Sequence, residues 1–368
     1  MNNTDRHVKE PLFHITKRSD IIWWKAWLIR AAAIFAALVV CAFVIVMITE
    51  YNPIQVYATM FKGNFGSKRK IFVLLQNLAM LLCISIAVTP AFKMKFWNLG
   101  AEGQTLVGGL ASAACMFYFK DSIPNVLLVL IMLVCSISAG IIWGVIPAFC
   151  KAKWGTNESL FTLMMNYVAM QLVAFAIMVW VPNGSNVMGV INQNTEAGWL
   201  PNLFGQKYLI NILVVALVTA FMYVYLKYSK QGYEISVVGE STNTARYIGI
   251  NVKKVIIRTM IISGAICGLA GFLLVSGTNH TVSKDLAGGM GFTAIMVSWL
   301  AKFNPVTMVV TSFLIVFLQK GAGEIATTFR LNESVSDILT GIIIFFIIGC
   351  EFFINYKINK RSKQKEVK

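Results

Sequence analysis

Residues 71–91 read IFVLLQNLAMLLCISIAVTPA, an apolar run without a charged side chain. A helix needs about 20 predominantly apolar residues to cross the hydrocarbon core of a bilayer, so this run predicts a transmembrane helix. The whole chain of 368 residues has the same character, with 57% hydrophobic and 13% charged residues. Soluble domains have about 45–50% and ~25%. Composition therefore excludes soluble, disordered and disulfide-scaffold classes and predicts an all-α integral membrane protein.

Similar apolar runs recur along the chain on both sides of residues 71–91. We predict ten transmembrane helices, at residues 27–49, 71–91, 99–119, 126–149, 160–181, 208–226, 255–277, 286–301, 305–319 and 336–355. Only Lys302-Phe303-Asn304-Pro305 separates the eighth from the ninth, so one long kinked helix is the alternative there.

The basic residues decide between nine and ten spans. With ten spans, both termini and most of the 32 Lys and Arg residues lie on one side, which the positive-inside rule makes the cytoplasmic side. We therefore expect a multi-pass protein of the cell membrane with both termini cytoplasmic. It has an N-terminal tail (1–26), a transmembrane domain (27–355) with an external loop (182–207) and an internal loop (227–254), and a basic tail (356–368). A basic cluster at residues 62–70 falls on the external side, against the positive-inside rule. An interfacial segment at these residues is the one explanation that we offer.

The sequence offers little for catalysis or for a cofactor. The net charge of +16 would suggest nucleic acid for a soluble protein, whereas here it indicates basic cytoplasmic loops. The seven cysteines form no C-x-x-C pair, and the three histidines form no H-E-x-x-H motif. We expect no metal, no cofactor, no catalytic residue and no nucleic acid partner. Because no phosphate loop of the G-x-x-x-x-G-K-[ST] type occurs, any ATP hydrolysis belongs to another chain.

Two glycine-rich breaks indicate an internal repeat. Residues 98–104 (NLGAEGQ) follow the second span, and residues 288–293 (GGMGFT) follow the seventh. An offset of five spans is odd, so the second copy would be inverted and the two breaks would approach from opposite membrane faces. Broken helices at matching positions of inverted repeats point to a transport site. The alternative is that these glycines only allow close helix packing, as in Gly140-x-x-x-Gly144 and Gly264-x-x-x-Gly268.

Glu102 is the acid that lies most clearly in an apolar context. An ionisable group there costs about 2.5–3.5 kcal/mol on insertion scales, which makes it a functional candidate. The alternative is that Glu102 caps its own helix, whose N-terminal dipole favours a carboxylate. We expect a polar solute pathway formed by Asn77, Asn98, Glu102, Gln104, Asn166 and Phe292. Asn77 and Asn166 can equally be hydrogen-bonding links between helices, and Gln171 is assigned to that role. Tyr167 and Phe292 are among the aromatic residues that could stack on a base or simply anchor at the interface.

The internal loop predicts a short helix under the membrane. Ser241 is a favourable N-cap and Gly249 a natural stop, so the helix carries Arg246 and Tyr247. Exposed Arg and Tyr side chains can dock into a groove on a partner protein. A solvated connecting helix is the alternative.

Four motifs resemble permease subunits of ABC importers in the ribose/branched-chain-amino-acid class, most closely the nucleoside permeases that work with basic-membrane-protein-type lipoproteins. FWNLGAEGQ (96–104) resembles F-x-N-I-G-A-E-G-Q, and NESLFTLMMNY (157–167) resembles N-E-V-I-x-T-L-M-L-N-Y. GESTNTARYIGI (239–250) is similar to G-E-N-P-x-A-A-R-Y-A-G-I, and GFTAI (291–295) to the start of G-F-T-A-I-A-V. The chain departs from the family at Ser236, where Arg is usual, and at Ser241-Thr242, which replace Asn-Pro.

The resemblance implies an inverted-repeat permease subunit of an ATP-driven importer, of the kind that carries nucleosides. It implies three partners: a tandem-cassette ABC ATPase, a second and shorter permease, and a lipid-anchored solute-binding protein. The residues that would couple to the ATPase are Gly239, Glu240, Ala245, Arg246, Tyr247 and Gly249. The alternatives are a permease for a pentose or a branched-chain amino acid, or a proton-driven transporter that acts alone. A membrane enzyme is a more distant alternative.

Overall fold

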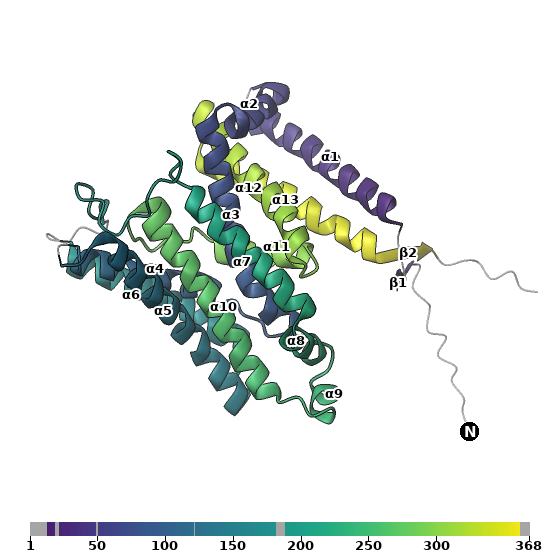
Figure 1. Ribbon diagram of the computed structural model, residues 1–368. Coiled ribbons are helices and arrows are strands. Elements are labelled where there is room, and N and C mark those ends of the chain that lie inside the picture. The colour runs from purple at the N-terminus through teal and green to yellow at the C-terminus, as the bar shows by residue number, and fades with distance from the viewer. Residues whose placement is uncertain (1–12, 19–21, 49–50, 121, 182–187, 361–368) are drawn as a thin grey trace, which may run out of the picture. The chain divides into compact units, whose positions relative to one another are not determined.

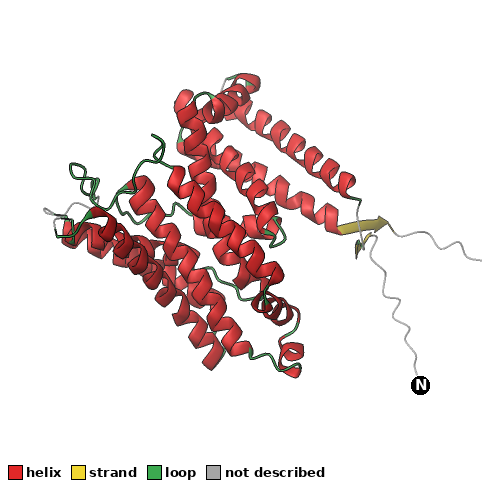
Figure 2. Cartoon of the chain, in the orientation of Figure 1, coloured by secondary structure: helices red, strands yellow, loops and turns green. Residues whose placement is uncertain are grey.

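The computed structural model describes residues 13–18, 22–48, 51–120, 122–181 and 188–360, and helices form most of them (Figures 1 and 2). Parts of the predicted tails and of the external loop (1–12, 19–21, 182–187 and 361–368) lie outside the described residues. In order, the elements are β1 (Phe13–Lys17), α1 (Trp23–Ile48), α2 (Pro53–Phe65), α3 (Lys68–Lys93), α4 (Ala101–Tyr118), α5 (Asn125–Trp154), α6 (Glu158–Trp180), α7 (Leu209–Tyr228), α8 (Lys230–Glu240), α9 (Thr242–Tyr247), α10 (Val252–Leu274), the π-helix η2 (Val275–Asn279), α11 (Met290–Leu300), α12 (Pro305–Thr328), α13 (Glu333–Asn355) and β2 (Tyr356–Lys360).

Each of the ten predicted apolar runs corresponds to a helix, namely α1, α3 to α7 and α10 to α13. Among the described residues, seven helices are long and apolar enough to cross a membrane. The fold prediction of an all-α integral membrane protein is therefore confirmed.

The main differences from the prediction are two helix boundaries and one additional helix. Instead of residues 286–301, α11 has 11 residues and begins at Met290, because Gly288 and Gly289 adopt left-handed φ angles of 55° and 72° that end a helical path. The helix after the break continues to Thr328, well past the predicted residue 319. Helix α2 was not predicted. Its 13 residues are too few to span a bilayer, which agrees with an interfacial segment near the basic cluster.

The chain divides into two compact units, one formed by residues 64–317 and the other by residues 1–63 and 318–368. In the larger unit, α3, α4 and α10 form the buried centre. The backbones of α4, α5 and α10 touch at glycines. A Cβ atom on Gly140 would lie 2.3 Å from the Gly264 oxygen, and one on Gly271 would lie 2.3 Å from the Thr105 oxygen. Glycine therefore allows these three helices to pack with no side chain between their backbones, as proposed for the two G-x-x-x-G pairs.

The smaller unit contains α1, α13 and the two strands. Arg30 of α1 and Glu351 of α13 form an ion pair with an N–O distance of 2.6 Å, which lets two charges near apolar segments neutralise each other. The strands β1 and β2 pair antiparallel, with Phe13 opposite Lys360 and Lys17 opposite Tyr356. This sheet was not predicted, although β1 (FHITK) and β2 (YKINK) both show the alternation of apolar and polar residues that marks a strand.

Candidate functional site

Two broken helices meet start to start in the larger unit. Glu102, in the first turn of α4, is 2% exposed. Its carboxylate accepts the backbone N–H of Gly289 at 2.9 Å and that of Gly291 at 2.7 Å. These donors belong to the start of α11, so Glu102 caps α11. The alternative drawn from the sequence, that Glu102 caps its own helix α4, is not what the hydrogen bonds show. The negative charge also lies at the positive end of the α11 dipole.

Beyond this junction, α4 and α11 run toward opposite ends of the bundle. The end of α4 contacts the loop before α7, where Asn192 donates to the Met116 oxygen at 2.9 Å. The end of α11 lies by the end of α3, where the Ser298 and Thr89 hydroxyls are 2.8 Å apart. That part of α3 contacts α8, which follows the far end of α7 (Figure 1). This is the arrangement that an inverted repeat with two breaks predicts.

Buried amides fix the start of α4. The Asn166 side chain of α6 accepts the N–H of Gly103 and donates to the Leu99 oxygen, both at 2.8 Å. Asn98 accepts the N–H of Gly100 at 3.1 Å and donates to the Ser263 hydroxyl of α10 at 3.2 Å. These amides use their hydrogen-bonding groups within the protein. We call Asn98, Glu102, Gln104, Asn166, Gly289 and Gly291 the α4–α11 junction.

The remaining pathway candidates lie differently. Gln104 donates to Asn98 at 3.3 Å, while its carbonyl oxygen has no partner in the described part of the chain. Asn77 is partly buried and donates to the Val73 oxygen one turn earlier on its own helix. Phe292 is 43% exposed on α11. The structure thus brings Asn98, Glu102, Gln104 and Asn166 together, but neither Asn77 nor Phe292 hydrogen-bonds through its side chain to them among the described residues.

Sequence reasoning missed two junction partners, Thr162 and Ser263. The Thr162 hydroxyl accepts the N–H of Leu99 at 3.1 Å. Thr162 and Ser263 are buried and short, and nothing in their sequence context separates them from other small polar residues of transmembrane helices. The helical spacing of Thr162 and Asn166 was the available signal, since residues four apart lie on one face.

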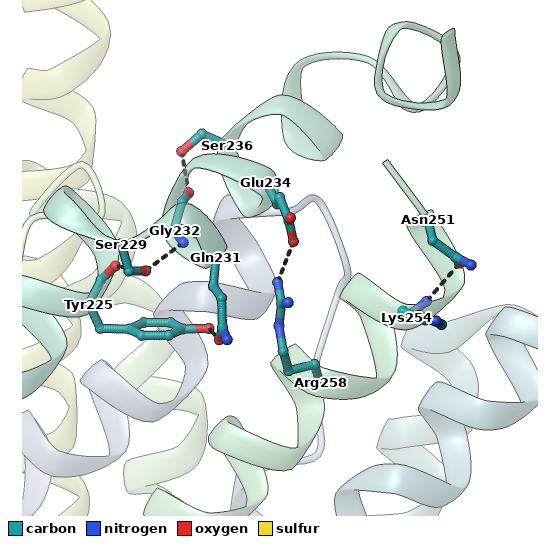
Figure 3. Close-up of polar contacts among 9 residues, drawn as sticks. All are labelled: Tyr225, Ser229, Gln231, Gly232, Glu234, Ser236, Asn251, Lys254 and Arg258. Atoms are coloured by element: carbon teal, nitrogen blue, oxygen red, sulfur yellow. Dashed lines mark hydrogen bonds and ion pairs between the residues drawn. The ribbon is translucent and has the colours of Figure 1, made fainter. Parts of the chain in front are cut away.

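At the other end of the bundle, α8 is held firmly (Figure 3). Glu234 of α8 and Arg258 of α10 form an ion pair at 2.8 Å. The Ser229 hydroxyl caps α8 by accepting the N–H of Gly232 at 2.9 Å. A Cβ atom on Gly239 would lie only 2.0 Å from the Lys93 oxygen at the end of α3, so glycine allows α8 to pack directly on that backbone. Ser236, where the family usually has Arg, bonds its own helix at the Gly232 oxygen.

The short helix α9 projects from α8 with its polar residues free to contact a partner. As predicted, Ser241 caps it by accepting the N–H of Thr244 at 3.2 Å, and Gly249 follows its end with a φ of 85°. Ala245 is buried, whereas Arg246 is exposed and Tyr247 is 93% exposed. Glu240, just before α9, is also exposed. The helix therefore presents Arg246 and Tyr247 away from the bundle while Ala245 holds it in place.

The loop before α7 folds over the opposite end of the bundle. Its Trp199 ring stacks on His280 with centroids 3.7 Å apart, and the Ile191 N–H donates to the His280 oxygen at 2.8 Å. Both rings line a cavity of about 260 Å³ that also includes Glu196 and Lys207. Burial, aided by the positive charge of Lys207, lowers the pKa of His280 to about 4.

We expect this histidine to make the loop less stable in acid. An unfolded histidine has a pKa of about 6.5, so between about pH 6.5 and 4 the unfolded chain binds a proton that the folded loop does not. Stability is therefore full above pH 6.5 and decreases as the pH falls through this range. His280 has a φ of 52°, which asparagine tolerates.

The measurement is the melting temperature of the purified protein from pH 7 to 4.5, for the wild type and for His280→Asn. The wild type should lose more stability over this range, because the variant has no histidine to protonate. Equal pH dependence in the two proteins would contradict the assignment.

The family described as branched-chain amino acid transport system / permease component matches residues 69–348, and the chain belongs to this family. The chain is 28% identical over 324 residues to a guanosine ABC transporter permease of Bacillus subtilis, covering 87% of this chain and 92% of the relative. It is 27% identical to a nucleoside ABC transporter permease of Lactococcus lactis, covering 88% and 90%. It is 26% identical to a glucose ABC transporter permease of Haloferax volcanii, covering 93% and 92%.

Family membership confirms the resemblance seen in the four motifs. The protein is a multi-pass transmembrane permease component of an ABC importer, and its relatives are permease subunits rather than enzymes. All four motifs now have a structural meaning. The motifs at 96–104, 157–167 and 291–295 supply both sides of the α4–α11 junction, and the motif at 239–250 forms the end of α8 together with α9.

Proposed function

We propose that this permease carries nucleosides into the cell. Two relatives that align along nearly nine-tenths of the chain carry the names guanosine and nucleoside permease, which supports this solute class. The similarity to a glucose permease makes a sugar the competing solute. A separate, tandem-cassette ATPase drives transport and binds α9. The supporting observation is that α8 is anchored by the Glu234–Arg258 ion pair while Arg246 and Tyr247 of α9 are exposed beyond it.

The remaining partners follow the same proposal. A second, shorter permease completes the membrane pathway, and a lipid-anchored binding protein delivers solute to the end opposite α9. Both termini lie on the cytoplasmic side of the cell membrane. The pairing of β1 with β2 supports this orientation, because it brings residues 13–17 and 356–360 to the same side and so requires an even number of crossings.

Within the permease, Asn98, Glu102, Gln104 and Asn166 act on transport by holding the α4–α11 junction together. Three observations support this role: both carboxylate oxygens of Glu102 are bonded, both groups of the Asn166 amide are bonded, and Asn98 is fully buried. Phe292 keeps an exposed ring and remains a pathway candidate. The Asn77 amide donates to the Val73 oxygen of its own helix, and Asn77 is the least supported of the six pathway candidates.

Uptake assays test the proposal. The chain is expressed with its partner subunits in cells that lack their own nucleoside uptake, and entry of radiolabelled guanosine, glucose, ribose and leucine is measured. We expect guanosine uptake that disappears when the ATPase is inactivated and persists when the proton gradient is collapsed. Uptake of glucose, ribose or leucine without guanosine would overturn the solute class, and uptake without the ATPase would overturn the mechanism.

A further inference from the structure

One exposed face of α6 differs from its surroundings in carrying polar groups deep in the membrane. The helix has 23 residues and packs mainly against α4 and α5, with Thr162, Asn166, Ala169, Val173 and Ile177 buried. The opposite side, which we call the open face of α6, consists of Leu160, Met164, Tyr167, Gln171, Phe175 and Met178, all exposed. Tyr167 is 57% exposed.

The ends of α6 show how deep these groups lie. At one end Glu158 pairs with Lys151 at 2.7 Å, and at the other Trp180 donates to the Tyr118 hydroxyl at 2.9 Å. Charged pairs and amphipathic aromatic residues are typical of the two membrane interfaces. At 1.5 Å per residue, Gln171 lies roughly 13 Å from the nearer end. The open face therefore places Tyr167 and Gln171 near the middle of the hydrocarbon layer.

Lipid tails offer no hydrogen-bond partner to the Tyr167 hydroxyl or the Gln171 amide. Gln171 has no hydrogen-bond partner among the described residues, and its assignment as a link between helices is not supported by any contact there. An amide in hydrocarbon without a partner is strongly unfavourable. Lipid contact looks different on α7, whose exposed residues between 210 and 226 are all apolar, Leu213, Leu217, Phe221 and Val224 among them.

We propose that Tyr167 and Gln171 contact the solute on its way through the membrane, an inference that rests on the proposed nucleoside transport. The two residues are four positions apart and so share one face of the helix. A phenol ring offers a stacking surface for a planar base, and a glutamine amide offers one acceptor and two donors to a base edge. The Asn98 and Asn166 amides are not available for this contact, because they already bond to the backbone at the start of α4.

Transport kinetics test the site in the complete transporter. Gln171→Leu removes the polar contact, and we expect the KM for guanosine to increase about tenfold while the maximal rate and the amount of protein in the membrane are retained. Tyr167→Ala should have a similar effect, and Tyr167→Phe, which keeps the ring, should restore most of the affinity. Leu217→Ala on the exposed face of α7 is the matched control and should leave the KM unchanged.

Chemical labelling gives a second measure that does not depend on transport. Gln171→Cys should react with a charged, water-soluble methanethiosulfonate, and guanosine should slow the reaction, whereas Leu217→Cys should remain unreactive. The seven native cysteines are buried or partly buried, so the wild type supplies the background. An unreactive Gln171→Cys, or a KM that neither Gln171→Leu nor Tyr167→Ala changes, would overturn the inference.

These outcomes separate this site from the proposed solute. If guanosine is transported but neither variant changes its KM, the site fails and the function stands. If the transporter carries glucose instead, and Gln171→Leu raises the KM for glucose, the function fails and the site stands.

Discussion

Replacing Arg246 or Tyr247 with alanine should reduce solute uptake at least about tenfold without removing the protein from the membrane. Both side chains lie on α9 and are exposed, Tyr247 at 93%. Arg and Tyr are enriched among the hot-spot residues of protein interfaces, the few positions at which truncation costs about 2 kcal/mol or more. Because every 1.4 kcal/mol is a factor of about ten, loss of either anchor should disconnect the permease from its motor.

Two measurements identify uncoupling. Uptake of labelled solute and ATP hydrolysis by the assembled transporter are followed together, and hydrolysis should continue while uptake is lost. Lys253→Ala is the matched control, since this exposed lysine lies on the same end of the bundle in the first turn of α10. Normal uptake in both Arg246→Ala and Tyr247→Ala would contradict the assignment of α9.

Replacing Glu102 should destabilise the permease before it affects solute recognition. Glu102→Gln keeps the shape of the side chain but turns one of its two acceptors into a donor that faces a backbone N–H. Hydrogen bonds to a charged group contribute about 1.5–3 kcal/mol, and a buried donor left without a partner costs about 1–3 kcal/mol. We expect a lower melting temperature and a reduced yield of the assembled transporter.

Glu158→Gln is the control for this prediction. Glu158→Gln removes an ion pair at the edge of the bundle, where such pairs contribute about 0–1 kcal/mol, so it should change the melting temperature little. A Glu102→Gln protein that melts like the wild type but transports poorly would instead place Glu102 in the solute pathway.

Much of the fold could be predicted from the sequence because the bilayer restricts the choice. A spanning segment must be helical and apolar for about 20 residues. Seven of the described helices are long and apolar enough to meet this requirement, and each of the ten predicted runs corresponds to a helix. The cap at Ser241 and the stop at Gly249 were equally predictable, since both depend on one residue and its neighbours in sequence. The start of α11 was placed four residues too early, at residue 286, although the glycine-rich break at residues 288–293 had been recognised.

The roles of polar residues could not be read from their positions alone. Glu102, Asn166 and Gln171 all interrupt apolar runs, but the first two are buried against backbone N–H groups and the third is exposed. What separates them is which side of a helix faces a neighbour, and this depends on tertiary packing. The same limit explains why the sequence offered only a pathway role or a cap on α4 for Glu102: the N–H of Gly291 that it accepts is 189 residues further along the chain.

The glycine contacts among α4, α5 and α10 have a mechanical consequence. Backbones that touch directly interlock and leave no side-chain layer in which one helix can slide along another, so these helices should turn as a solid block. If α9 receives a movement from the ATPase, as proposed, the Glu234–Arg258 ion pair connects α8 to α10 and gives that movement a route into the block. We therefore expect α4, α5 and α10 to move as one rigid body in each transport cycle. The bending should be confined to the connecting segments around them, such as the turn at residues 301–304.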